Sequence, residues 1–116
     1  MKFTSEIKNE ILFLTMKGDL IGEENGLSII EVIKDNIDKG ILSCIIDISG
    51  LRYINSSGIG VLITILTKFR NKGGDVFLLQ PSESVKKLLI ITKLNAIFTI
   101  VETNEEAISK INELKS

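Results

Sequence analysis

The sequence predicts an α/β fold with a mixed, mostly parallel sheet of four or five strands, an N-terminal hairpin and about four flanking helices. Two observations support this prediction. Short apolar runs typical of strands alternate with longer segments whose apolar residues recur at helical spacing. The first two runs are separated by only three polar residues, which indicates an antiparallel hairpin at the edge of the sheet.

The N-terminal half predicts the hairpin and a first helix. Residues 2–7 and 11–18 are the two strand-like runs, and residues 8–10 between them are typical of a turn. A loop then leads into a helix over about residues 24–38, which ends at Gly40. The apolar stripe of this helix is Leu27, Ile30, Ile33 and Ile37.

Residues 43–48, SCIIDI, form an apolar run without alternation. A strand that is covered on both faces of a sheet has this pattern, so we expect a central strand. Cys44 lies inside the run and is expected to be a small buried side chain. The remaining elements are a helix over 56–71 that closes at Gly73–Gly74, a strand over 75–79, a helix opened by residues 81–82, a strand over 96–101 and a terminal helix.

The terminal helix is marked by the pattern T-x-x-E from Thr103 to Glu106, a capping box. Its apolar residues Ile108, Ile111 and Leu114 are expected to face inward. Because the chain shows no linker and no internal repeat, we expect residues 1–116 to form a single domain.

Composition excludes several classes of function. The net charge is −1 and the isoelectric point is about 5.5, so we expect neither nucleic acid nor a membrane as a partner. The chain has no histidine, the usual general base of serine catalysis and a common zinc ligand, and we expect no metal site and no cofactor. The N-terminal segment lacks the apolar core of a secretory signal, which favours a cytoplasmic protein.

The stretch CIIDISGLRYINSSGIGVLITIL places two serines, Ser56 and Ser57, at the start of an apolar helix. Asn55 or Ser56 can cap this helix. Capping does not explain Gly58 and Gly60, because each glycine in a helix costs nearly ~1 kcal/mol relative to alanine. They are expected to provide bare backbone that another molecule can approach closely.

The apolar residues of this helix cover about half of its circumference. Val61 and Ile65 lie to one side of the face that is expected to pack on the sheet, which comprises Ile59, Leu62, Ile63, Leu66 and Phe69. This flank is covered either by the helix that contains VKKLLII, or by a partner protein, or by both.

The serine loop, residues 55–60, has four candidate chemical roles. A nucleophilic serine needs a base, and the chain has neither histidine nor a G-x-S-x-G elbow. A phosphate-binding loop needs G-x-x-x-x-G-K-[ST], and a dinucleotide fingerprint needs G-x-G-x-x-G; neither is present. Asp47 could be the acceptor of a receiver domain, but no acidic pair follows the first strand to hold magnesium. A serine that accepts phosphate fits best, since phosphate is well tolerated at a helix N-terminus.

The segment IIDISGLRYINSSGIGVLITI resembles the signature of STAS domains, and specifically of the bacterial anti-sigma factor antagonists. The matching elements are the D-[LI]-S run at Asp47, the aromatic Tyr53 and the [DN]-S-[ST]-G-[LI]-G motif over residues 55–60. Asn55 stands where the family usually has aspartate, and Ile21 where it often has aspartate. Asp19, Glu23 or Glu24 can supply a negative charge in place of the latter.

The resemblance implies a STAS-like fold and a signalling protein without enzymatic activity. In the family, the serine after [DN] is phosphorylated by an anti-sigma factor that is also a serine kinase, and a metal-dependent serine phosphatase reverses this. The acceptor implied here is Ser56, and the implied contacts with the partner are Asp19, Asn55, Ser57, Gly58, Ile59, Gly60 and Val61. The alternative is a STAS interaction module of another signalling assembly that is not regulated by phosphorylation.

Overall fold

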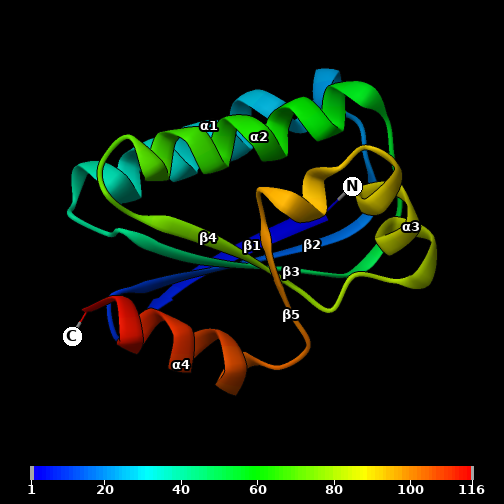
Figure 1. Ribbon diagram of the computed structural model, residues 1–116. Coiled ribbons are helices and arrows are strands. Elements are labelled where there is room, and N and C mark those ends of the chain that lie inside the picture. The colour runs from blue at the N-terminus through cyan, green and yellow to red at the C-terminus, as the bar shows by residue number, and fades with distance from the viewer. Residues whose placement is uncertain (1, 116) are drawn as a thin grey trace.

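The computed structural model describes residues 2–115, with all of their side chains except those of residues 22–25 and 115. In chain order the elements are β1 (Lys2–Lys8), β2 (Ile11–Leu20), α1 (Gly22–Asp38), β3 (Ser43–Ile54), α2 (Ser56–Arg70), β4 (Asp75–Leu79), α3 (Glu83–Ile91), the 3₁₀ helix η1 (Leu94–Ala96), β5 (Thr99–Val101) and α4 (Asn104–Lys115). The five strands form one sheet in the order β1-β2-β3-β4-β5 (Figure 1). Only β1 pairs in the antiparallel sense, which confirms the predicted fold class.

The hairpin between β1 and β2 turns within two residues. Asn9 and Glu10 have φ angles of 51° and 65°, and Lys8 pairs with Ile11 across the turn. Two successive residues with positive φ are typical of the tight turn whose twist matches that of the flanking strands. The parallel strands are instead joined through helices, as parallel pairing requires.

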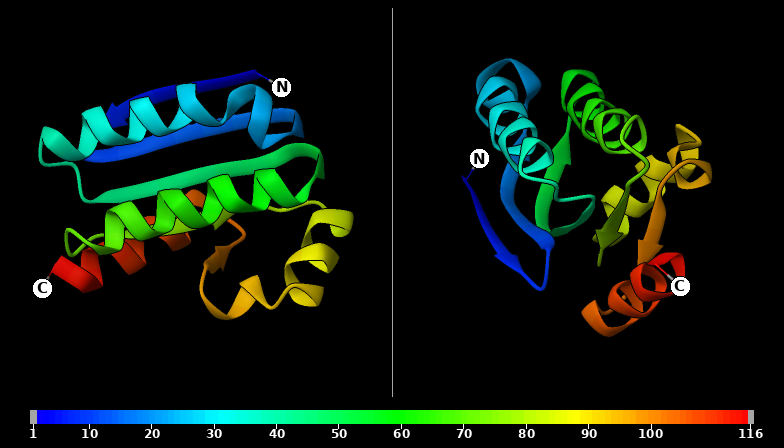
Figure 2. Two further views of the ribbon diagram at one scale, coloured as in Figure 1. Left: turned by 90° about the horizontal axis from the view of Figure 1, so that it is seen from above. Right: turned by 90° about the vertical axis from the view of Figure 1, so that its left-hand side faces the viewer.

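The helices cover the two faces of the sheet unequally. α1 and α2 lie side by side on one face, and α4 lies on the other (Figure 2). α4 contacts β3, β4 and β5, so the same face of β1 and β2 has less cover. α3 packs against β3 and η1 near the end of the sheet where β3 leads into α2 (Figure 1).

The central strand β3 supplies side chains to the core on both sides of the sheet. Cys44 and Ile46 belong to the larger core cluster with α1 and α2, whereas Ile45 belongs to the smaller cluster with Ala107 and Ile111 of α4. All of these side chains are buried, which confirms the strand predicted from the unbroken apolar run. Burial raises the pKa of the Cys44 thiol, so this thiol stays protonated and unreactive in the folded protein.

The lengths of β3 and β5 differ most from the sequence prediction. β3 continues to Ile54, because its second half pairs with the end of β2 instead of forming a loop. The predicted strand over residues 96–101 is only Thr99–Val101, and the chain before it forms η1. Phe98 is buried in the larger core cluster, so its apolar character reflects packing rather than strand pairing.

Two helix faces also need correction. In α1, Leu27 was expected to be buried but is 84% exposed, and Ile29 is buried instead. In α4, Ile111 is buried as predicted, but Leu114 is exposed, and Ala107 is buried in its place. The predicted cap of α4 is confirmed, since the Glu106 N–H donates to Oγ1 of Thr103 at 3.1 Å.

Within the described part of the chain, no helix combines the length and the apolarity needed to cross a membrane.

Candidate functional site

The start of α2 is attached to the end of β2. In the parallel register Asp19 pairs with Tyr53 and Leu20 pairs with Ile54, so the two strands end together. The N–H of Asn55 then donates to the carbonyl oxygen of Leu20 at 3.2 Å. Asp19 and the serine loop therefore lie at the same end of the sheet, although they are far apart in the sequence.

Asn55 is the N-cap of α2. Its Oδ1 accepts a hydrogen bond from the Gly58 N–H at 2.7 Å, and its carbonyl oxygen accepts from the Ile59 N–H at 3.0 Å. Of the two caps that the sequence allowed, Asn55 is therefore the one used. An asparagine provides this cap as well as the aspartate that is usual in the family.

Because Asn55 is the cap, the two serines are helical residues at the start of α2. Ser56 is exposed and Ser57 is half-buried. The first turn of α2 contains no acidic residue, and the positive end of the helix dipole points to this turn. An added anion at Ser56 would consequently meet a favourable local field.

Gly58 and Gly60 have different surroundings. Gly58 is buried, and a Cβ there would collide with the Leu20 carbonyl oxygen and lie 2.9 Å from Cγ2 of Ile54. At Gly58 the group that approaches closely is therefore the chain's own backbone at Leu20, not another molecule. This corrects the expectation for Gly58. A Cβ at Gly60 would have no atom within 4 Å, so only Gly60 leaves open space at the surface.

The flank of α2 is covered by α1, not by the helix that contains VKKLLII. Val61 is buried, and a Cβ at Gly26 of α1 would lie only 3.2 Å from Cγ2 of Val61. Ile65 is also buried, whereas Ile63, expected in the buried face, is 37% exposed. The buried face of α2 is thus turned toward α1 relative to the prediction.

A shallow hollow lies along the line where α1 and α2 meet, next to the serines. We call it the α1–α2 hollow; its lining residues are Gly26, Leu27 and Ile30 from α1 and Ser57, Gly60, Val61 and Thr64 from α2. Three of these, Ser57, Gly60 and Val61, were expected to contact a partner. The α1 side of the hollow was not predicted, because Leu27 was expected in the core. The competing apolar stripe through Ile29 and Ile33 was the sequence signal for the correct face.

Asp19 forms a surface ion pair beside the site. Its Oδ2 lies 3.6 Å from Nη2 of Arg52, and both side chains are well exposed. Such a pair contributes little to stability, so both groups remain available to a partner. The negative charge proposed for Glu23 or Glu24 falls on side chains outside the described residues.

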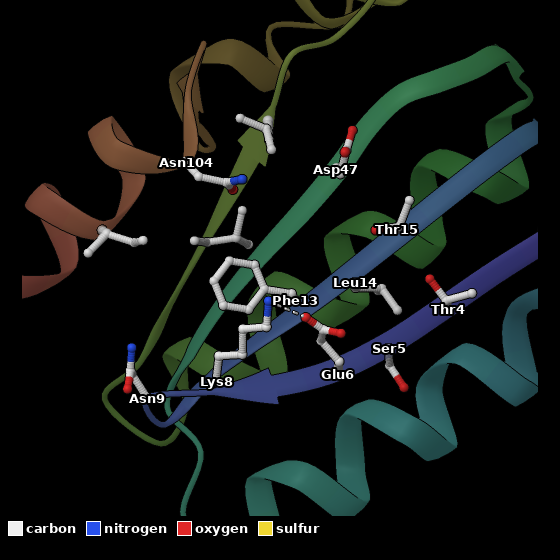
Figure 3. Close-up of a pocket in the computed structure, with 13 residues that line it drawn as sticks. Thr4, Ser5, Glu6, Lys8, Asn9, Phe13, Leu14, Thr15, Asp47 and Asn104 are labelled. Atoms are coloured by element: carbon white, nitrogen blue, oxygen red, sulfur yellow. Dashed lines mark ion pairs between the residues drawn. The ribbon is translucent and has the colours of Figure 1, made fainter.

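A second hollow, of about 480 Å³, lies on the opposite face of the sheet beside α4 (Figure 3). It exists because α4 covers only part of this face. Its charged groups have partners within the chain: Lys8 Nζ lies 2.9 Å from Oε1 of Glu6, and Oδ1 of Asp47 accepts from the N–H and hydroxyl of Ser49. Asp47 is also in the middle of β3, so it is not placed at a strand end as a receiver-domain acceptor would be.

Among the side chains that the structure describes, no three of the types His, Cys, Asp and Glu lie close enough together to hold a metal ion.

The fold and the serine loop define a class of protein. Residues 2–107 match the sequence profile of the family described as the STAS domain, so the chain belongs to the STAS domain family. One relative is a candidate anti-sigma factor antagonist of Thermotoga maritima, which is 28% identical over 109 residues that cover 94% of this chain and 96% of the relative.

Solved structures of one protein, the anti-sigma factor antagonist SpoIIAA, share the fold. The unphosphorylated form is 23% identical, covers 96% of this chain and 98% of SpoIIAA, and superposes with a TM-score of 0.75. The phosphorylated form, from Bacillus, is 24% identical, covers 95% and 99%, and gives a TM-score of 0.74. The same fold is therefore found in both states of SpoIIAA.

Proposed function

We propose that this protein is an anti-sigma factor antagonist that is switched by phosphorylation of Ser56. In the unphosphorylated form it binds an anti-sigma factor through the start of α2 and so frees a sigma factor. The anti-sigma factor is itself the serine kinase, and a metal-dependent serine phosphatase removes the phosphate. The protein acts by binding, without enzymatic activity of its own, in the cytoplasm where sigma factors work.

The observation that carries this proposal is the exposed hydroxyl of Ser56 on the first turn of a capped helix. Asn55 holds the helix start through the Gly58 N–H, so the fold does not need the Ser56 side chain. A phosphate on Ser56 would be attracted by the helix dipole and by backbone N–H groups of the first turn. It would thus leave the domain folded.

The same phosphate changes the surface strongly. It adds about −1.5 to −2 charges next to Ser57, Gly60 and Val61, whose surroundings are largely apolar. A partner that covers this surface would have to remove water from the phosphate without offering a matching cation, and this costs free energy. The name of the Thermotoga maritima relative supports an anti-sigma factor as this partner.

Phosphate transfer tests the assignment. The protein is incubated with ATP and with each kinase-like anti-sigma factor encoded in the same genome, and the modified residue is mapped by mass spectrometry. We expect a single phosphate on Ser56, lost in Ser56→Ala but retained in Ser57→Ala. If a kinase that is active on another antagonist leaves Ser56 unmodified, the non-phosphorylated interaction module becomes the better assignment.

A further inference from the structure

The α1–α2 hollow begins one helical turn from the proposed phosphate acceptor. Ser56 and Gly60 are four residues apart on α2 and are therefore neighbours on the helix surface. Gly60 is exposed and lines the hollow, and no atom lies within 4 Å of the place where its Cβ would be. A protein that covers Ser56 would also lie over this hollow.

The chemistry of the hollow is apolar. None of its described lining residues carries a charge. Thr64 is the most polar group at its far end, but its hydroxyl donates to the Gly60 carbonyl oxygen at 2.8 Å within the same helix. Its hydrogen-bonding capacity as a donor is thus already used, and the side chains of Leu27, Ile30 and Val61 make much of the lining apolar.

Leu27 forms the outer wall of the hollow. At 84% exposure it is the most exposed large hydrophobic side chain of the described residues. Val61 fills the floor, packed on Gly26 of α1. A side chain placed in the hollow would contact Leu27, Val61 and the bare backbone at Gly60, and it would remove apolar surface of both molecules from water.

We propose that the α1–α2 hollow receives one apolar side chain, such as leucine, methionine or phenylalanine, of the protein that docks at Ser56. This inference rests on the proposed function. It adds the place where the partner's side chain binds, next to the serine whose phosphorylation prevents docking. The occupant is a partner protein because the hollow continues directly into the surface around Ser56. The lack of charge in the lining selects an uncharged, apolar anchor.

Leu27 is then needed for binding the partner, whereas the core of the fold does not include its side chain. We therefore compare Leu27→Ser with Ile91→Ser, which removes a similarly exposed apolar side chain (78% exposed) from α3. The probe is the kinase that modifies Ser56, and its affinity is measured by isothermal titration calorimetry. We expect Leu27→Ser to weaken binding about tenfold or more. Ile91→Ser should bind like the wild type, with both melting temperatures unchanged.

A second variant fills the hollow. Gly60→Leu places a side chain in the open space, so we expect it to fold and to weaken binding at least as much as Leu27→Ser. If both variants bind like the wild type while Ser56→Asp does not bind, the hollow is not the anchor and the proposed function stands. If Ser56→Asp binds like the wild type, the proposed function itself fails.

Self-association is the rival occupant. The wild type and Leu27→Ser are compared by analytical ultracentrifugation without the kinase. We expect both to be the same size; a dimer of the wild type that Leu27→Ser dissociates would assign the hollow to a second copy of this chain and overturn the proposal.

Discussion

Two glycines of the serine loop that look equivalent in the sequence have opposite physical roles. Gly58 is enclosed by Leu20 and Ile54, and its missing side chain allows α2 to start close to the end of β2. Gly60 faces open space, so the fold gains nothing from its flexibility. A glycine at position 60 lowers the stability of α2 relative to alanine. A docking role explains this cost, because a partner can then contact the exposed backbone of Gly60.

Alanine substitutions separate these roles. Gly58→Ala should lower the free energy of unfolding by about 1–3 kcal/mol, because the new Cβ collides with backbone. Gly60→Ala should raise it by up to about 1 kcal/mol, because alanine favours the helix and meets no neighbour. The measurement is urea unfolding followed by far-ultraviolet circular dichroism, since the chain has no tryptophan. Equal effects of the two substitutions would contradict the distinction.

At the scale of residues, local chemistry was predictable and long-range contacts were not. A cap at Asn55 or Ser56 and the capping box at Thr103 follow from short sequence patterns, and the structure contains the caps at Asn55 and Thr103. The close contact of Gly58 with Leu20 could not be predicted, because it depends on how β2 and β3 end side by side.

At the scale of elements, the orientation of α2 is decided by its neighbour α1. The apolar residues of α2 occupy half of its circumference, so the sequence permits several orientations on the sheet. In the fold, α1 packs on the side of Val61 and Ile65, and the opposite side leaves Ile63 partly exposed. The sequence could not decide between these orientations, because the choice depends on which helix packs beside α2.

Aspartate substitutions on the two sides of α2 test this orientation. Val61→Asp should lower the free energy of unfolding by about 3 kcal/mol, because an unpaired carboxylate would be buried against α1. Ile63→Asp should cost no more than about 1 kcal/mol, because water can reach that side chain. Chemical unfolding of the two variants under identical conditions measures the difference. A larger loss for Ile63→Asp would mean that the helix is turned the other way.

At the scale of the whole molecule, the fold class was predictable because every level of the sequence agrees. The tight turn, the buried central strand and the alternation of helices with strands all indicate one mostly parallel sheet with an antiparallel edge. The unequal cover of the two faces was not predictable, because it depends on where the short β5 and α4 come to lie.

The residues that stabilise the start of α2 differ from those that we assign to docking. The residues that hold the start of α2, Asn55, Gly58 and Leu20, are hydrogen-bonded or buried. The residues that we assign to docking, Ser56, Gly60 and Leu27, are exposed. A charge added at Ser56 should therefore alter binding while the core remains unchanged.

The most direct test compares the protein with and without phosphate on Ser56. The affinity for the kinase-type anti-sigma factor is measured by titration calorimetry, and the melting temperature of each form is measured alone. We expect phosphorylation to weaken binding by about thirtyfold or more, with no loss of melting temperature. Equal affinities of the two forms would contradict the claim that a negative charge at Ser56 forbids docking.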